Sequence, residues 1–472
     1  MDGSIIADQT KGAVAYRAPY VWMISTVAAL GGLLFGYDFV VIGGAKPFYE
    51  SYFQLHSEQL VGWANSCALL GCLLGSVISG AMADRFGRKG LLIVSALLFA
   101  VSSVLTGWAP TFTWFVMWRI SGGVAIGIAS NISPMYIAEV SPAPWRGRLV
   151  ALNQLTIVVG ILAAQVVNWM IAQRVPEGAT AEMIRLSWNG QFGWRWMFTA
   201  VAVPSVVFFT SAWFVPESPR WLLRNHQKEA ARRTLARIGG ESYADGASRE
   251  IEQTVGGEET RAGWSQLMTR GIFKVLAVGI GLAVLQQWSG INVIFNYAEE
   301  IYRSAGYGVS DTLFNIVITG TINLVFTLAA LSFVDRLGRR SLMLLGCAGI
   351  GLSHLVIGFA YRSGVKGLPV LILTLCTLAC YAMSLAPVTW VLISEIFPNR
   401  VRGAAVSVSV SALWIACFVL TYTFPILNRA LGAAGTFWVY AGICAAGFWF
   451  VFLAVPETKG KSLEQIEHEL SR

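Results

Sequence analysis

Charged residues are scarce in this chain: Asp, Glu, Lys and Arg together make up 13% of its 472 residues, whereas hydrophobic residues make up 55%. Soluble domains carry about 25% charged residues, so an ordinary water-facing surface is excluded. The mean hydropathy is +0.60, and apolar stretches of about 20 residues, long enough to cross hydrocarbon as helices, recur along the chain. The sequence therefore predicts an integral membrane protein with helical spans.

Residues that bind metals or act as nucleophiles are also few and scattered. There are four histidines and seven cysteines, and every cysteine falls inside an apolar stretch, which argues against a disulfide framework. Neither an H-E-x-x-H motif, nor a catalytic carboxylate pair, nor a glycine-rich phosphate loop stands out. We expect no enzyme, no metal site and no cofactor. The net charge of +8 fits membrane topology and calls for no nucleic acid.

Twelve apolar stretches can be marked off as membrane spans. They cover residues 20–45, 60–82, 90–108, 112–138, 149–172, 195–215, 272–298, 311–333, 341–361, 367–394, 402–427 and 435–455. The prediction is an all-α protein with twelve transmembrane helices. Lys and Arg in the connections favour a cytoplasmic location for both termini, and we expect a bacterial inner membrane.

The chain repeats itself at an interval of about 250 residues. "GAMADRFGRKG" at 80–90 returns as "LSFVDRLGRRS" at 331–341, and "EVSPAPWRGRLV" from Glu139 returns as "EIFPNRVRGAAV" from Glu395. A third motif, "PESPRW", returns as "PETKGK". Such a duplication predicts two six-helix halves with a substrate site between them near the bilayer midplane, exposed alternately by rocking of the halves.

These patterns divide the chain into five parts. We predict a cytoplasmic amino-terminal tail (1–19), an amino-terminal half (20–215), an intracellular linker with short helices (216–270), a carboxy-terminal half (271–455) and a cytoplasmic carboxy-terminal tail (456–472).

Two charges are set clearly inside spans, the acid Asp38 in the first and the base Arg119 in the fourth. An unpaired charge in hydrocarbon is costly, so we expect the two to face each other. An acid held in this way can load and release a proton as a cavity opens to either side. The structural alternative is a permanently locked pair that only fastens the two helices.

Intramembrane amides gather in a few spans, and two tryptophans accompany them. They are Asn153, Gln154, Gln165, Asn168, Gln286, Gln287, Asn292, Asn296, Asn315 and Asn323, with Trp390 and Trp414. Amides both donate and accept hydrogen bonds, and an aromatic face covers the apolar side of a sugar ring, so the cluster predicts a site for a neutral polyol. Any single amide here can instead join helices. Gly290 predicts a break that turns Gln287 and Asn292 toward one cavity, and Pro387 predicts a second hinge.

Several segments together resemble the sugar porter branch of the major facilitator superfamily: "GGLLFGYD", "DRFGRK", "RISGGVAIG", "EVSPAPWRGRL", "PESPRWLL", "QQWSGINVIFNYA", "VDRLGRR", "PVTWVLISEIFP" and "PETKGKSLEQIE". The resemblance implies a sugar site formed by Gln154, Gln286, Gln287, Asn292, Asn323 and Trp390, closed by Trp414, with Phe35, Ile161, Phe295 and Asn296 beside it. It also implies an intracellular gate that includes Glu217 and pairs Arg88 and Arg146 with Glu395 or its neighbours, and Arg339 and Arg402 with Glu139 or its neighbours.

Asp38 discriminates within that family. The resemblance to bacterial proton symporters rests on this acid and Arg119, since the facilitative glucose transporters have a neutral Asn there. Ile161 replaces a glutamine of the xylose symporter and Phe295 resembles the hexose carriers, whereas Asn296 replaces a common tyrosine of the family and Leu413 a common amide. We predict a monomeric proton–monosaccharide symporter, for a hexose or else a pentose such as xylose. A uniporter without proton coupling and a non-transporting sugar sensor are the alternatives.

Overall fold

The computed structural model describes residues 16–176, 178–257, 269–398 and 401–458, and all regular secondary structure within them is helical. The first six spans are α1 (Ala18–Phe53), α2 (Glu58–Phe86), α3 (Arg88–Gly107), α4 (Phe112–Val140), α5 (Arg146–Ile171) and the consecutive η1 (Asn189–Gly193), α7 (Trp194–Thr199) and α8 (Ala202–Ala212). The later spans are α11 (Arg270–Trp288) with α12 (Ile291–Asn296), α14 (Val309–Leu337), α15 (Arg339–Arg362), α16 (Leu368–Met383) with α17 (Leu385–Glu395), and α18 (Arg402–Ala454).

The last helix contains two spans. By length and composition, 11 helices of the described chain can cross a membrane, and α18, with 53 residues, includes the non-helical Gly432 at φ 69° and ψ 171°. Divided at Gly432, these helices give the twelve transmembrane segments that the sequence predicted.

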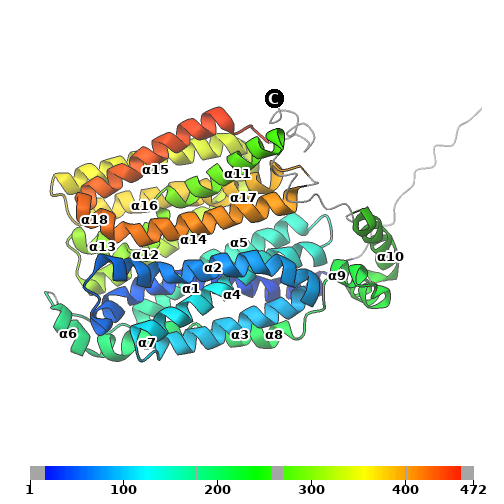
Figure 1. Cartoon of the computed structure of the whole chain (residues 1–472), viewed down its shortest axis with the longest axis horizontal. Helices are drawn as coiled ribbons and strands as arrows, with labels where there is room; N and C mark the ends of the chain where they lie inside the picture. Colours follow the sequence, from blue (N-terminus) through cyan, green and yellow to red (C-terminus); the bar gives the residue numbers. More distant parts are fainter. Residues whose placement is uncertain (1–15, 177, 258–268, 399–400, 459–472) are drawn as a thin grey trace, which may run out of the picture.

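The first six spans lie together as one layer of the molecule and the last six as another (Figure 1). The layers meet mainly where α2 packs on α18 and α5 packs on α14. Within the first layer, α1 and α5 approach closely because Gly36 and Gly160 have no side chain: a Cβ on either would collide with a backbone carbonyl of the other helix.

Helices outside the main spans mark the two ends of the bundle. α9 (Pro219–Arg224) and α10 (Lys228–Gly257) lie at one end, which we call the linker end, while α6 (Ala181–Leu186) and α13 (Ala298–Ser304) lie at the other, which we call the far end (Figure 1). Short helices between the sixth and seventh spans were predicted. Most of both predicted tails (1–15 and 459–472) and part of the linker (258–268) fall outside the described residues.

Two spans are broken. α11 stops before Gly290, which takes φ +87°, and the chain resumes as α12, as the sequence predicted. The break between α16 and α17 falls at Ser384, with φ −129° and ψ −87°, and not at Pro387. Pro387 lies in the first turn of α17, where a missing N–H leaves no helical hydrogen bond unmade.

Candidate functional site

Asp38 and Arg119 form an ion pair between α1 and α4. Nη1 of Arg119 lies 3.0 Å from Oδ1 of Asp38, Nη2 lies 3.4 Å from the Asp38 carbonyl oxygen, and each residue is 3% exposed. The predicted juxtaposition of the two charges is confirmed. Because both are buried, each depends on the other for its electrostatic compensation.

One oxygen of Asp38 is left over. Oδ2 is buried and has no hydrogen-bond partner among the described residues. A Cβ on Gly122 of α4 would lie 3.3 Å from this oxygen and 3.1 Å from Oγ of Ser102. The guanidinium of Arg119 also lies 5.4 Å from the ring centre of Phe198. The pair therefore keeps one carboxylate oxygen that is able to receive a proton without first breaking a hydrogen bond.

Around the break at Gly290, three amides form a chain of hydrogen bonds. Nδ2 of Asn292 donates to Oε1 of Gln287, and Nε2 of Gln287 lies 3.3 Å from Oε1 of Gln286. Nε2 of Gln286 in turn donates to the carbonyl oxygens of Leu385 and Ala386, at 3.2 and 3.3 Å, beside the break before α17. The breaks in the two spans thus bring the predicted amides together and link them to each other.

A buried histidine holds the first break in place. Nε2 of His354 in α15 lies 2.9 Å from the carbonyl oxygen of Ser289, which lies directly before Gly290. A Cβ on Gly290 would lie 3.0 Å from the same ring nitrogen. The position therefore needs glycine both for its positive φ and for space.

Aromatic residues lie between the two layers. The ring centres of Phe35 in α1 and Trp414 in α18 are 5.8 Å apart. Trp414 is buried and its Nε1 has no partner among the described residues, which leaves a donor for a ligand hydroxyl.

The other predicted sugar-site residues are placed less uniformly. Ile161, Phe295, Asn296 and Asn323 are buried, Gln154 is half-buried and Trp390 is 37% exposed. Oδ1 of Asn296 has no partner in the described chain. Hydrogen bonds join Gln286, Gln287 and Asn292 into one cluster, whereas Trp390 on α17 is partly exposed.

Gln165 was absent from the predicted sugar site. It is buried in α5, and neither Nε2 nor Oε1 finds a partner among the described residues. Its amide packs on Gly320 of α14, at the seam between the two layers. A buried amide with both polar atoms unpaired is costly, so Gln165 is a candidate residue for binding the sugar. Its presence among the intramembrane amides was the available sequence signal.

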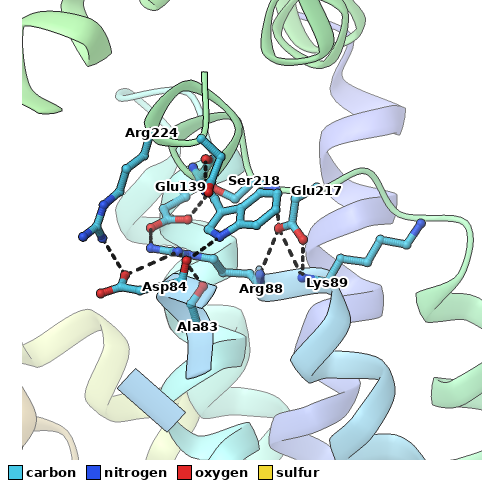
Figure 2. Close-up of polar contacts among 10 residues, drawn as sticks. Ala83, Asp84, Arg88, Lys89, Glu139, Glu217, Ser218 and Arg224 are labelled. Carbon is cyan, nitrogen blue, oxygen red and sulfur yellow. Dashed lines mark hydrogen bonds and ion pairs between the residues drawn. The ribbon is translucent and has the colours of Figure 1, made fainter. Parts of the chain in front are cut away.

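At the linker end, a polar network joins α2, α3 and α4 to the start of the linker (Figure 2). Arg88 lies 2.9 Å from Glu139, and the hydroxyl of Ser218 donates to the other oxygen of Glu139. Glu217 accepts from the backbone N–H groups of Arg88 at 2.9 Å and Lys89 at 3.2 Å, the first two residues of α3. Glu217 therefore satisfies N–H groups that a helix start leaves free.

Burial raises the pKa of Glu217, and the backbone N–H groups that donate to it act in the opposite direction. Arg224 of α9 adds an ion pair of 2.6 Å to Asp84. These contacts attach the linker to the first layer.

The second layer carries the same arrangement at its own linker end. Glu457 accepts from the N–H groups of Arg339 at 3.0 Å and Arg340 at 3.1 Å, and Thr458 donates to Glu395 at 2.6 Å. Arg339 lies 3.6 Å from Glu395. The internal repeat seen in the sequence is therefore a repeat of contacts as well as of letters.

The gate pairs predicted from the resemblance join the two layers, and their formation in a state closed at this end stays a prediction. Arg88 pairs with Glu139 at 2.9 Å and Arg339 with Glu395 at 3.6 Å, and in each pair both residues belong to the same layer. Arg146 donates to the carbonyl oxygen of Ala138 and Arg402 to that of Phe397. The motif charges named here lie at the linker end, and their role as a gate stays a prediction.

Replacing Gly87 by Ala is expected to destabilise the protein by ~1–3 kcal/mol. Gly87 has φ +81°, and an added Cβ would collide with the carboxylate of Glu217, so both the backbone and the network must shift. Thermal melting in detergent measures the effect. Gly90→Ala is the matched control, because its added Cβ meets no atom within 4 Å; equal melting of the two variants would contradict the assignment.

Comparison with known proteins reveals similarity over almost the whole chain. The family model described as sugar (and other) transporter matches residues 24–470. The chain is 42% identical to the glucose transport protein of Synechocystis, with 95% of this chain and 97% of the relative covered. It is 36% identical to the D-xylose-proton symporter of Escherichia coli, with 96% of each chain covered.

Solved structures share this fold. The inward open conformation of the xylose transporter XylE from E. coli matches with a TM-score of 0.83 and 36% identity, covering 95% of this chain and 100% of the other. The XylE complex with 6-bromo-6-deoxy-D-glucose matches with a TM-score of 0.79 and 35% identity, covering 96% of this chain and 100% of the other.

Proposed function

The chain belongs to the sugar (and other) transporter family, and we propose that it imports a monosaccharide together with a proton by alternating access. Relatives named as a D-xylose-proton symporter and an arabinose-proton symporter support the proposal. Members of this family carry solutes, so the chain is a transporter and not an enzyme.

The observation that carries the proton-coupling proposal is the buried pair of Asp38 and Arg119. In our proposal Asp38 binds the proton at Oδ2, the oxygen without a partner among the described residues. Protonation neutralises the carboxylate and weakens its hold on Arg119, which frees α1 to move relative to α4. Release of the proton on the other side restores the pair at 3.0 Å and resets the carrier.

The sugar is held between the two layers in this proposal. Gln287 and Asn292 donate to and accept from its hydroxyls, with Gln286, Gln165 and Asn323 around them, and Trp414 covers an apolar face of the ring. Trp390, which is partly exposed on α17, contacts the sugar in this proposal. We favour a hexose, with a pentose as the second choice; relatives named for glucose, xylose and arabinose support both.

We further propose that the linker end faces the cytoplasm of a bacterial inner membrane, with both termini on that side, and that the structure is inward-facing. Among the described residues, ion pairs that join the layers occur at the far end, Lys46 with Glu300 and Arg429 with Glu58, whereas Arg88 at the linker end pairs with Glu139 of its own layer. In the outward-facing state the linker-end network closes across the halves 20–215 and 271–455.

Uptake by proteoliposomes tests this function. The purified chain is offered radiolabelled glucose, galactose, xylose and arabinose, with and without an imposed gradient that is acidic outside. We expect at least one sugar to accumulate above equilibrium only with the gradient, and addition of that sugar to remove protons from the outer medium. Equilibration without proton movement would instead establish a uniporter, and failure of the whole panel would overturn monosaccharide transport.

A further inference from the structure

Lys46 lies in α1, two turns beyond Asp38 toward the far end, and is 2% exposed. Three carboxylates surround its Nζ: Glu300 at 2.6 Å, Glu50 at 3.3 Å and Glu299 at 3.5 Å. A buried lysine without partners is costly, so this environment is what allows the ammonium to remain inside the protein. The predicted first span, 20–45, stopped just before this residue, because the sequence did not show that α1 continues through Pro47 to Phe53.

The Lys46 cluster connects the two layers of the molecule. Lys46 and Glu50 belong to α1 in the first layer, whereas Glu299 and Glu300 belong to α13, which follows the broken seventh span. The ammonium also lies 5.6 Å from the ring centre of Tyr297, whose hydroxyl donates to the carbonyl oxygen of Thr421 in α18 at 2.6 Å. Lys46 of the first layer thus contacts α13 and the preceding Tyr297, and Tyr297 in turn is bonded to α18.

Near the Lys46 cluster, the backbone of α1 also lies very close to the backbone of α12. A Cβ on Gly43, one turn before Lys46, would lie 2.5 Å from the carbonyl oxygen of Phe295 in α12. Beyond this contact, a cavity of about 380 Å³ is lined by Lys46, the three carboxylates, His56 and Arg303 among others. The Lys46 cluster and the contact at Gly43 therefore lie between the sugar-site region and a polar cavity. This cavity is able to hydrate the charged groups once α1 and α13 separate.

The balance of charges makes the contact between α1 and α13 at the far end depend on Lys46. With the lysine present, one cation compensates three nearby carboxylates, of which Glu299 is also 2.9 Å from Arg303. Without it, like charges from α1 and α13 are left facing each other at low exposure, and they repel. Separation of the two helices relieves that repulsion, because water then solvates each carboxylate.

We propose that Lys46 is the latch of the far-end gate: its ion pairs with Glu299 and Glu300 hold this end shut in the captured state and must break in every transport cycle. The proposal rests on alternating access as proposed above. Within the described chain, Arg429 and Glu58 also form an ion pair between the layers, but their side chains are 71% and 28% exposed, and such pairs contribute little. The latch therefore depends on the buried cluster.

Distances between spin labels at the two ends test the latch without requiring transport. A far-end pair is placed at Gln59 and Ser363, which are both exposed, and a linker-end pair at Gly147 and Gly403, where an added Cβ meets no atom within 4 Å. Cys376 and Cys380, the cysteines that are not buried, are first replaced by Ser. In Lys46→Met, the far-end distance is expected to lengthen and the linker-end distance to shorten, with a shift of about tenfold or more in the ratio of the two states.

Further variants keep the test decisive if Lys46→Met does not fold. Glu300→Gln, at a partly exposed carboxylate, is expected to shift the ratio in the same direction by less. The charge swap Lys46→Glu with Glu300→Lys is expected to restore part of the parent distribution. Glu182→Gln is the matched control: its partner Arg185 lies on the same short helix α6 and both line the same cavity, so it should leave the distances unchanged.

Unchanged distances in both Lys46→Met and Glu300→Gln would overturn the latch, and so would a shift of equal size in Glu182→Gln. The same experiments separate failure of the latch from failure of the proposed proton symport. If the parent protein fails to accumulate any sugar with a proton gradient while Lys46→Met still shifts the distances, the latch stands and the symport proposal falls. If uptake is proton-driven but the distances never respond to Lys46 or Glu300, symport stands and the latch falls.

Discussion

Asp38→Asn is expected to abolish proton-driven accumulation of the sugar while leaving sugar exchange across the membrane. Asparagine keeps the size of the side chain but removes the group that gains and loses the proton. A potential of ~100 mV supplies ~2.3 kcal/mol per proton, which supports roughly fifty-fold accumulation of a neutral sugar. Uptake ratios in proteoliposomes with an imposed gradient should therefore fall from that order to about one.

Exchange of external radiolabelled sugar for internal unlabelled sugar is the internal control for Asp38→Asn. This counterflow needs no net proton movement, so its survival separates loss of coupling from loss of folding. Asp311→Asn, at an exposed carboxylate at the start of α14, is the matched variant and should retain accumulation. Uphill accumulation by Asp38→Asn at the parental level would contradict the assignment of the proton site.

Gln287→Leu is expected to raise the KM for the sugar by about tenfold to a hundredfold, with proton coupling of the remaining flux intact. Gln287 is the middle of the amide chain: it accepts from Asn292 and contacts Gln286. Leucine has a similar volume but offers no hydrogen bond, and a lost bond to a ligand hydroxyl costs about 1–3 kcal/mol when the other partner stays buried. Initial uptake rates over a range of sugar concentrations give the KM.

Asn131→Leu is the matched control for Gln287→Leu. Its amide nitrogen donates to the carbonyl oxygen of Ser76 and to the hydroxyl of Ser79, at 3.0 and 2.9 Å, and so joins α4 to α2 within the first layer. Its loss should reduce thermal stability and leave the KM within about twofold. A KM for Gln287→Leu that does not differ from that of Asn131→Leu would show that the chain of amides serves helix packing and not the sugar.

Sequence reasoning reached the membrane class, the twelve spans and the pairing of Asp38 with Arg119. Each follows from a strong local cost: apolar stretches of sufficient length belong in lipid, and two isolated charges inside it are stable only together. The break at Gly290 was predicted for a similar reason, since glycine takes the positive φ that the observed break requires. The roles of the sugar-site residues stay predictions.

Other features could not be read from the chain as letters. Lys46 sits just past the predicted end of the first span, and its three carboxylates come from its own helix and from a segment about 250 residues away. Gln165 looked like any amide that joins helices until its two polar atoms proved to have no partner in the described chain. Arg88 and Arg339 were predicted to pair across the layers, and each contacts a glutamate of its own layer in this structure.

By itself the sequence determined that this protein lies in a membrane, how many spans it has and that Asp38 and Arg119 pair, because burying polar backbone or an unpaired charge in hydrocarbon is costly for any chain. The internal repeat was read directly from the sequence. The tertiary structure decided which glutamate Arg88 and Arg339 each contact, which charges join the layers at the far end and which buried amides lack a partner among the described residues. These depend on the relative position of two helical layers, and a transporter has more than one such position for a single sequence.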